Sequence, residues 1–132
     1  MQTCHMVIVQ NADKLKVDIQ QTCMQYKTIK QWAYILHDKG DTRPHYHIYL
    51  NFHPTSANTA DVAKWFQLGY TDEKGVERSG EQFIKNVRTG EKDALLCLIL
   101  SFDGKAQYSP SDVVCNFDFE DAIAVPKPRE KA

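Results

Sequence analysis

The segment HYHIYLNF, residues 45–52, constrains the fold more than any other part of the chain. Successive side chains of an extended strand point to opposite faces, so this segment divides into two sets. One face receives the polar set and the other the apolar set: His45, His47, Tyr49 and Asn51 against Tyr46, Ile48, Leu50 and Phe52. A period of two predicts a β-strand with one face packed on a core.

Further segments have the composition of strands. Residues 5–10, HMVIVQ, and 30–37, KQWAYILH, are rich in β-branched and aromatic side chains. The second is separated from residues 45–52 by a short charged segment, which predicts two antiparallel strands joined by a loop. After a polar loop over 71–80, another strand is expected within EQFIKNVR, residues 81–88.

Apolar side chains at helical spacing predict three helices. The first is expected to be capped by Asn11, the second is capped by Thr59 and ends at Gly69, and the third lies within EKDALLCLILSF, residues 91–102. Their apolar positions are, in chain order, Leu15, Ile19, Cys23 and Tyr26; Val62, Trp65 and Phe66; Leu95, Ile99 and Phe102. On the third helix, Cys97 and Leu100 point away from this stripe.

The order βαββαβ, with one or two extra C-terminal helices, predicts an α+β fold of the ferredoxin-like kind. Helices are expected mainly on one face of an antiparallel sheet, and the open face is expected to carry the histidines and any metal or DNA site. Residues 1–124 are predicted to form one domain, because 132 residues suit a single core. Residues 125–132, VPKPREKA, are predicted to be a charged tail or linker.

The overall composition excludes few functions. It is globular, with 42% hydrophobic and 25% charged residues, and a net charge of −1 argues neither for nor against a polyanionic partner. No segment approaches the ~20 apolar residues of a membrane span, and no secretory signal is visible, so an intracellular location without membrane contact is expected. The four cysteines, which form no C-x-x-C pair, are expected to be reduced and buried: Cys4, Cys23, Cys97 and Cys115.

The histidines of the segment HDKGDTRPHYH suit metal binding. His45 and His47, two residues apart on a strand, project in the same direction about 7 Å apart at their Cα atoms, so both imidazoles can reach one divalent cation. His37 ends the neighbouring strand, and Asp38 or Asp41 can add an oxygen ligand. This mixed set suits Mn²⁺, Mg²⁺ or Zn²⁺. The alternative is a solvated histidine pair, which the apolar back face and the third histidine disfavour.

The motif LHDKGDTRPHYHIYL, residues 36–50, resembles the signature of the HUH endonucleases. It is most similar to that of the rolling-circle replication initiators, the Rep proteins, of small Gram-positive plasmids, in which an H-D-K-D segment precedes a P-H-Y-H strand. Three further segments resemble a helix, a strand and the end of the nucleophile motif of that family: TSANTADVAKWF, FIKNVR and KAQYSPSDVV. The resemblance therefore covers most of the chain.

The resemblance implies a metal-dependent nickase of single-stranded or hairpin origin DNA in the bacterial cytoplasm. His45 and His47 would bind Mn²⁺ or Mg²⁺ together with His37 and an acidic residue that follows Lys39. The cation would polarise the scissile phosphate, and a tyrosine would attack it to form a 5′-phosphotyrosyl intermediate. Full-length initiators of this kind often carry a further C-terminal part, through which a homo-oligomer is expected.

Two departures from the family pattern concern the site. Where the family has H-D-K-D, this chain has a glycine, Gly40, so Asp41 is the nearest acidic ligand and Asp38 the less favoured one. Where the family has Y-L-x-H, the chain reads CLIL over residues 97–100. Three explanations for Cys97 stay open: a small hydrophobe in a degenerate copy, an introduced substitution, or a substitute nucleophile. Tyr108 is an alternative nucleophile, although the family position it matches looks structural.

Basic residues around the expected open face are candidates for DNA phosphate contacts: Arg43, Arg78, Lys85, Arg88, Lys92 and Lys105. Trp32 and Trp65 are expected in the core rather than in base stacking. Besides the nickase, two functions stay open, namely a DNA-binding module of the same fold that does not nick and a metal-binding protein unrelated to DNA. Loss of DNA affinity with added salt separates the last from the other two.

Overall fold

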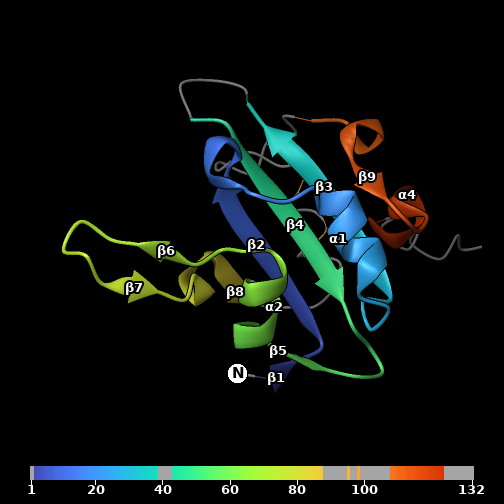
Figure 1. The fold of residues 1–132 in the computed structure, drawn as a ribbon. Helices are drawn as coiled ribbons and strands as arrows, with labels where there is room; N and C mark the ends of the chain where they lie inside the picture. Colours follow the sequence, from blue (N-terminus) through green and yellow to red (C-terminus); the bar gives the residue numbers. More distant parts are fainter. Residues whose placement is uncertain (1, 39–42, 88–94, 96–97, 99–107, 124–132) are drawn as a thin grey trace, which may run out of the picture.

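The computed structural model of the chain describes residues 2–38, 43–87, 95, 98 and 108–123. Its centre is a five-stranded antiparallel sheet with the strand order β8-β2-β4-β3-β9 (Figure 1). The five strands are β2 (His5–Asn11), β3 (Gln31–His37), β4 (His45–Asn51), β8 (Ile84–Asn86) and β9 (Val114–Cys115). The first four follow the strands predicted from sequence. The α+β, ferredoxin-like fold class is therefore confirmed.

The remaining described elements are short. Two small sheets pair β1 (Gln2–Thr3) with β5 (Ala57–Asn58) and β6 (Tyr70–Thr71) with β7 (Glu77–Arg78). The helices are α1 (Ile19–Gln25), α2 (Thr59–Trp65) and α4 (Phe119–Ile123), and single 3₁₀ turns are η1 (Ala12–Lys14), η2 (Glu81–Phe83) and η3 (Pro110–Asp112). Leu95 and Leu98 are also helical. Within the described ranges, no helix has the length and apolar character that a bilayer span requires.

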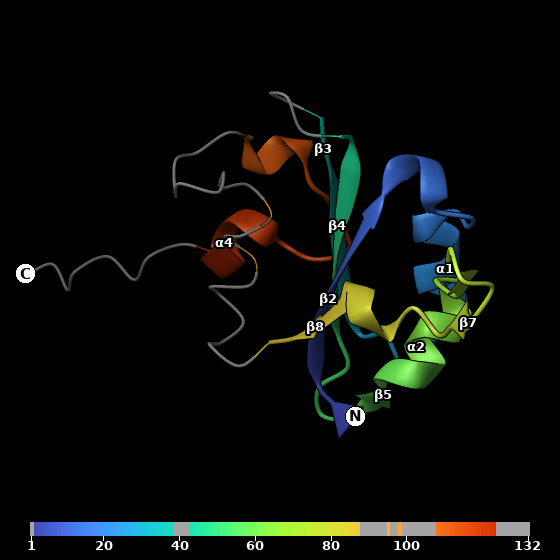
Figure 2. The same cartoon turned by 90° about the vertical axis from the view of Figure 1, so that its left-hand side faces the viewer.

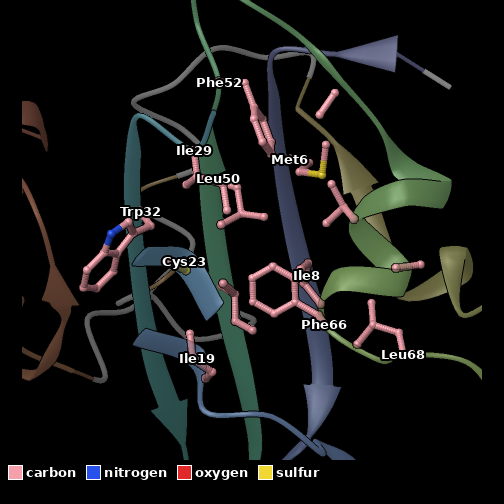
Figure 3. Close-up of a cluster of buried hydrophobic side chains, with 14 residues drawn as sticks. Met6, Ile8, Ile19, Cys23, Ile29, Trp32, Leu50, Phe52, Phe66 and Leu68 are labelled. Carbon is pink, nitrogen blue, oxygen red and sulfur yellow. The ribbon is translucent and has the colours of Figure 1, made fainter. Parts of the chain in front are cut away.

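One face of the sheet packs against α1 and α2, which lie together on that side (Figure 2). The apolar side chains of β2 and β4 meet the helices there, and Ile48, Leu50 and Phe52 are fully buried. Figure 3 shows Phe66 and Leu68 over β2, with Ile19 and Cys23 of α1 beside β3 and β4. The predicted apolar set of residues 45–52 thus lies in the main core, together with Met6 and Ile8 of β2 and Trp32 of β3. Burying such side chains is the largest favourable contribution to folding.

The second face of the sheet is less open than predicted. Ala33, Ile35 and Tyr49 of β3 and β4 form a second buried cluster on that face. The residues that cover them come from the C-terminal half of the chain: Leu95, Leu98, Tyr108, Val113 and Phe119. In Figure 2, α4 lies on the side of the sheet opposite to α1 and α2. The sheet is therefore covered on both faces, and the histidines lie at one end of the second face.

The helix starts differ from those predicted. The first α-helix begins after Asp18, whose carboxylate accepts the N–H of Gln21 at 2.9 Å, and not after Asn11. Asn11 ends β2 and is the N-cap residue of the short 3₁₀ turn η1, without a side-chain capping bond; the N–H of Ala12 bonds to the carbonyl of Pro44 at 3.0 Å, which ties this segment to the loop before β4. The cap of α2 is Asn58 instead of Thr59. Its C-cap is Phe66, so that helix ends before Gly69.

The described cysteines and tryptophans differ in how deeply they are buried. Cys23 is buried, and burial raises the pKa of its thiol to about 12, so this cysteine stays protonated at neutral pH. Cys4 and Cys115 are half-buried free thiols, whereas Cys97 lies outside the described residues, as do residues 124–132 with the predicted tail. Trp32 is buried as expected, and Trp65 is half-buried and stacks on Tyr26 with ring centroids 4.3 Å apart.

Two glycines in the polar segment 71–80 adopt a left-handed backbone conformation but differ in the space around them. Gly75 and Gly80 both have positive φ, at 78° and 85°. An added Cβ at Gly75 would meet nothing within 4 Å, whereas one at Gly80 would lie 2.5 Å from the backbone of Leu68. Gly75→Ala should therefore lower the free energy of unfolding by about 1 kcal/mol through backbone strain alone. Gly80→Ala should lower it by about 3 kcal/mol or more, because strain and overpacking add.

Chemical denaturation of both variants measures this difference, and Gly75→Ala serves as the matched control. Equal losses in the two variants would contradict the close approach of residue 80 to Leu68. The same segment was expected to be a loop, yet it contains the hairpin β6–β7, whose turn is held by Asp72 through the N–H groups of Lys74 and Val76.

Candidate metal centre

Pairing of the two central strands β3 and β4 brings three histidines together. The register places His37 directly opposite His45, at the end of both strands, and His47 lies two residues further along β4. Side chains of directly paired residues and of residues two apart share a face of the sheet. All three imidazoles therefore project from the same face, where the alternation in the sequence predicted two of them.

The three imidazoles are in mutual contact. The ring centroids of His37 and His47 are 4.0 Å apart, those of His45 and His47 are 5.0 Å apart, and those of His37 and His45 are 5.3 Å apart. One ring nitrogen from each residue lies within 4.8 Å of the others. His37 is buried, and the other two are half-buried. Three nitrogen donors at this separation can bind a single cation.

Hydrogen bonds to backbone carbonyls set the tautomers of two of these rings. Nε2 of His37 lies 2.6 Å from the carbonyl oxygen of Leu98, and Nδ1 of His45 lies 2.9 Å from that of Arg43. A carbonyl can only accept, so in the neutral form of each ring this nitrogen carries the hydrogen and donates it. The opposite nitrogens, Nδ1 of His37 and Nε2 of His45, keep their lone pairs. This is how metal-binding histidines are commonly oriented.

The protonation of the cluster also suits a metal. The pKa of His47 is lowered to about 3, mainly by burial and to a smaller extent by electrostatic repulsion from His37, His45 and Lys85. Burial is also the main cause that lowers the pKa of His37, and it outweighs the opposite effect of the bond to Leu98. Both rings are therefore neutral at pH 7, and a cation binds the neutral form. The donor set fits a divalent transition metal.

The predicted oxygen ligands, Asp38 and Asp41, are not part of the described cluster. Asp41 lies outside the described residues. Among the residues that the structure describes, the group able to hold an ion consists of the three histidines, without Asp38. The backbone N–H of Asp38 instead donates to the hydroxyl of Tyr108 at 2.7 Å.

Tyr108 lies against the cluster. Its ring stacks on His37 with centroids 4.8 Å apart and an angle of 17° between the planes, and the residue is 7% exposed. Sequence reasoning weighed Tyr108 only as an alternative nucleophile and missed this contact. The carbonyl of Leu98 was also missed, since a backbone acceptor leaves no trace in the sequence. Cys97, the residue before Leu98, lies outside the described residues.

Of the predicted DNA contacts, Lys85 lies on the face of the histidines. It is exposed and pairs with Val7 of β2, while Val9, two residues along the same strand, pairs with His47. Its charge reaches the cluster, since it contributes to the low pKa of His47.

The other candidate cations are placed differently. Arg43 is exposed near the cluster and forms an ion pair with Asp13. Arg78 lies on β7, on the side of the sheet that carries α1 and α2, and its Nε donates to Asp72 at 2.8 Å (Figure 2). Arg88, Lys92 and Lys105 lie outside the described residues.

Comparison with known proteins gives one informative similarity. No family model matches the chain. The chain is similar to a protein named "Replication protein" of Onion yellows phytoplasma (strain OY-M), with 32% identity over 112 residues that cover 71% of this chain. The aligned part is 26% of that relative, so the chain spans about a quarter of its length. This chain is thus related to part of a replication protein.

Proposed function

We propose that this chain is the origin-binding and nicking domain of a rolling-circle replication initiator of the HUH type, in which the expected tyrosine nucleophile is replaced. The observation that carries the proposal is the cluster of His37, His45 and His47, with donor nitrogens within 4.8 Å of one another at the end of the central strands. Its sequence context, P-H-Y-H after H-D-K, supports the same family, as does the similarity to a replication protein. The setting would be plasmid replication in a bacterial cytoplasm.

The histidine cluster would hold a divalent cation, with Asp41 as a further ligand expected from sequence. Three imidazole donors favour Mn²⁺ over Mg²⁺, since Mg²⁺ prefers oxygen ligands. When bound, such a cation supplies Lewis-acid polarisation of the scissile phosphate. The chain itself keeps His37 and His47 neutral by burial and fixes the tautomers through the carbonyls of Leu98 and Arg43.

The chain's own contribution to DNA binding would begin at Lys85. An exposed ammonium group on the histidine face attracts phosphate and holds the strand beside the cluster. Arg43 could add a second contact after release from Asp13, and Arg88, Lys92 and Lys105 remain candidates from sequence. The aligned part is 26% of the relative, and a homo-oligomer would form through regions of such a protein outside the aligned part.

A second function is favoured by one specific observation. The motif expected to read Y-L-x-H reads CLIL over residues 97–100, so both the phenol and the histidine are replaced. A domain of this kind could bind origin DNA and a metal without cutting. Such a DNA-binding module is the alternative to the nickase, and the two differ in whether a covalent DNA adduct can form.

The salt dependence of DNA binding tests the proposed function. Affinity for a single-stranded or hairpin DNA should fall steeply between 50 and 200 mM salt, because each phosphate contact to a single strand contributes about 0.7 to the slope of log K against log [salt]. Lys85→Ala should weaken binding to all sequences and reduce this slope by about 0.7 to 1. Fluorescence anisotropy with labelled DNA at several salt concentrations measures both quantities.

Arg78→Ala is the matched control, since it also removes one exposed cation but from the opposite side of the sheet. Its slope should equal that of the unmodified chain. If no DNA is bound at 50 mM salt, a metal-binding protein unrelated to DNA becomes the better hypothesis. If Arg78→Ala changes the slope and Lys85→Ala does not, the DNA lies on the other face of the sheet.

A further inference from the structure

Tyr108 contacts both His37 and Asp38, the residue that follows His37. Its ring stacks on His37, with centroids 4.8 Å apart and nearly parallel planes, and its hydroxyl accepts the backbone N–H of Asp38 at 2.7 Å. Both contacts cross about 70 residues of sequence and reach the end of β3, where the chain leaves the sheet. The same side chain thus touches His37 and holds the residue that follows it.

The backbone after Tyr108 is itself fixed. Ser109 forms a capping box with Asp112 at the start of η3: the N–H of Ser109 donates to the Asp112 carboxylate at 2.9 Å, and the Ser109 side chain accepts the N–H of Ser111 at 3.2 Å. Tyr108 and Val113, on either side of this turn, are both buried in the second cluster. A ring mounted on a capped turn and packed into a core has little freedom to move.

His37 is consequently held from three directions. Tyr108 covers one side of its ring, His47 lies 4.0 Å away by ring centroids, and the carbonyl of Leu98 binds its Nε2 at 2.6 Å. These contacts leave Nδ1 as the nitrogen that can bind a cation. Ligands whose orientation is fixed before the metal arrives lose less conformational freedom on binding.

We propose that Tyr108 is a positioning residue for the metal ligand His37, and that it also fixes the start of the loop after β3 through the backbone of Asp38. The metal part of this inference rests on the proposed function. The hydroxyl already accepts a backbone N–H and the residue is 7% exposed, which suits a positioning role better than attack on a phosphate. Tyr108 would act through His37 and would not touch the DNA.

Two substitutions separate the two contacts. Tyr108→Phe keeps the stacked ring and removes the acceptor for Asp38, whereas Tyr108→Leu removes both. Metal affinity, measured by titration of free Mn²⁺ with electron paramagnetic resonance on folded protein, should fall about 10- to 100-fold in Tyr108→Leu, the usual range for loss of a contact that orients a metal ligand. Tyr108→Phe should lie between this variant and the unmodified chain. Unchanged affinity in Tyr108→Leu would overturn the proposal.

Val113→Ala is the control for a merely structural effect. Val113 belongs to the same buried cluster, so its truncation also lowers stability, but its metal affinity should match that of the unmodified chain. A loss of affinity in Val113→Ala as large as in Tyr108→Leu would mean that loosening of the second core, and not Tyr108 itself, sets the affinity.

A measurement without metal keeps the two proposals distinct. In Tyr108→Phe, the amide of Asp38 should exchange with solvent at least about tenfold faster than in the unmodified chain, because its hydrogen-bond acceptor is gone. Hydrogen exchange followed by nuclear magnetic resonance shows this in the metal-free protein. If the unmodified chain binds no Mn²⁺, the metal centre is wrong; if the Asp38 amide does not respond, the positioning role of Tyr108 is wrong.

Discussion

Mn²⁺ is expected to raise the melting temperature of this protein, and the double substitution His45→Ala with His47→Ala is expected to abolish the rise. A ligand that binds only the folded state stabilises it by about 2.7 kcal/mol at 100 times its dissociation constant. For a domain of 132 residues this corresponds to about 10 °C. With two of three imidazoles removed, His37 alone cannot hold the cation. Thermal scans with and without Mn²⁺ measure the effect.

The chain offers a close control for this experiment. His5 and His53 also form a ring pair, with centroids 6.4 Å apart, but they lie at the other end of the sheet, where His5 pairs with Asn51. The double substitution His5→Ala with His53→Ala removes the same atoms and should keep the full response to Mn²⁺. A response that survives loss of His45 and His47, or that disappears with His5 and His53, would refute the assignment.

The second large effect concerns cleavage. The unmodified chain is expected to bind single-stranded origin DNA in Mn²⁺ but to nick it feebly or not at all. The substitution Cys97→Tyr is expected to restore cleavage at least in part. A cysteine is shorter than a tyrosine by an aromatic ring and cannot span the same distance to a phosphate. The carbonyl of the next residue, Leu98, adjoins the cluster through its bond to His37.

The readout is a 5′-linked covalent adduct, visible as a shifted band on a denaturing gel. Cys97→Phe is the matched control, because it supplies the ring without the nucleophilic oxygen and should form no adduct. Leu100→His is combined with Cys97→Tyr to restore the second missing residue of Y-L-x-H. Robust nicking by the unmodified chain, lost in Tyr108→Phe and kept in Cys97→Ala, would show that the nucleophile has been misplaced. No adduct from any variant would favour the DNA-binding module.

The central part of the fold could be predicted because its signals are local. Alternation along residues 45–52 identifies β4 and the faces of its side chains, and the aromatic, β-branched segment before it identifies β3. The helix starts were misplaced because two residues of the Asx type compete: Asn11 and Asp18 both suit an N-cap. In the structure Asn11 precedes only the single 3₁₀ turn η1, whose first residue bonds to Pro44, far away in sequence, and Asp18 caps the α-helix.

The sequence of β3 indicates that the second face of the sheet is covered. Residues 31–37 carry apolar side chains on both faces of the strand, with Ala33 and Ile35 on the face of the histidines. A strand with two apolar faces indicates a sheet covered on both sides. What covers it could not be predicted, since β9 pairs with Ala33 and Tyr34 across about 80 residues of chain. The contact of Tyr108 with His37 is of the same long-range kind.

The seven-residue ladder between β3 and β4 fixes the positions of the paired histidines. His37 and His45 face each other because the whole ladder is in register, and that register is pinned by apolar side chains packed on both faces of the sheet. A slip by one residue would turn every side chain of a strand to the wrong face, so the two cores enforce the spacing of the imidazoles. The two paired histidines stand on the strands themselves, one before and one after the connection over residues 38–44. We therefore expect that a residue gained or lost in this connection, as between H-D-K-D and His37-Asp38-Lys39-Gly40-Asp41, leaves His37 and His45 paired on the ladder.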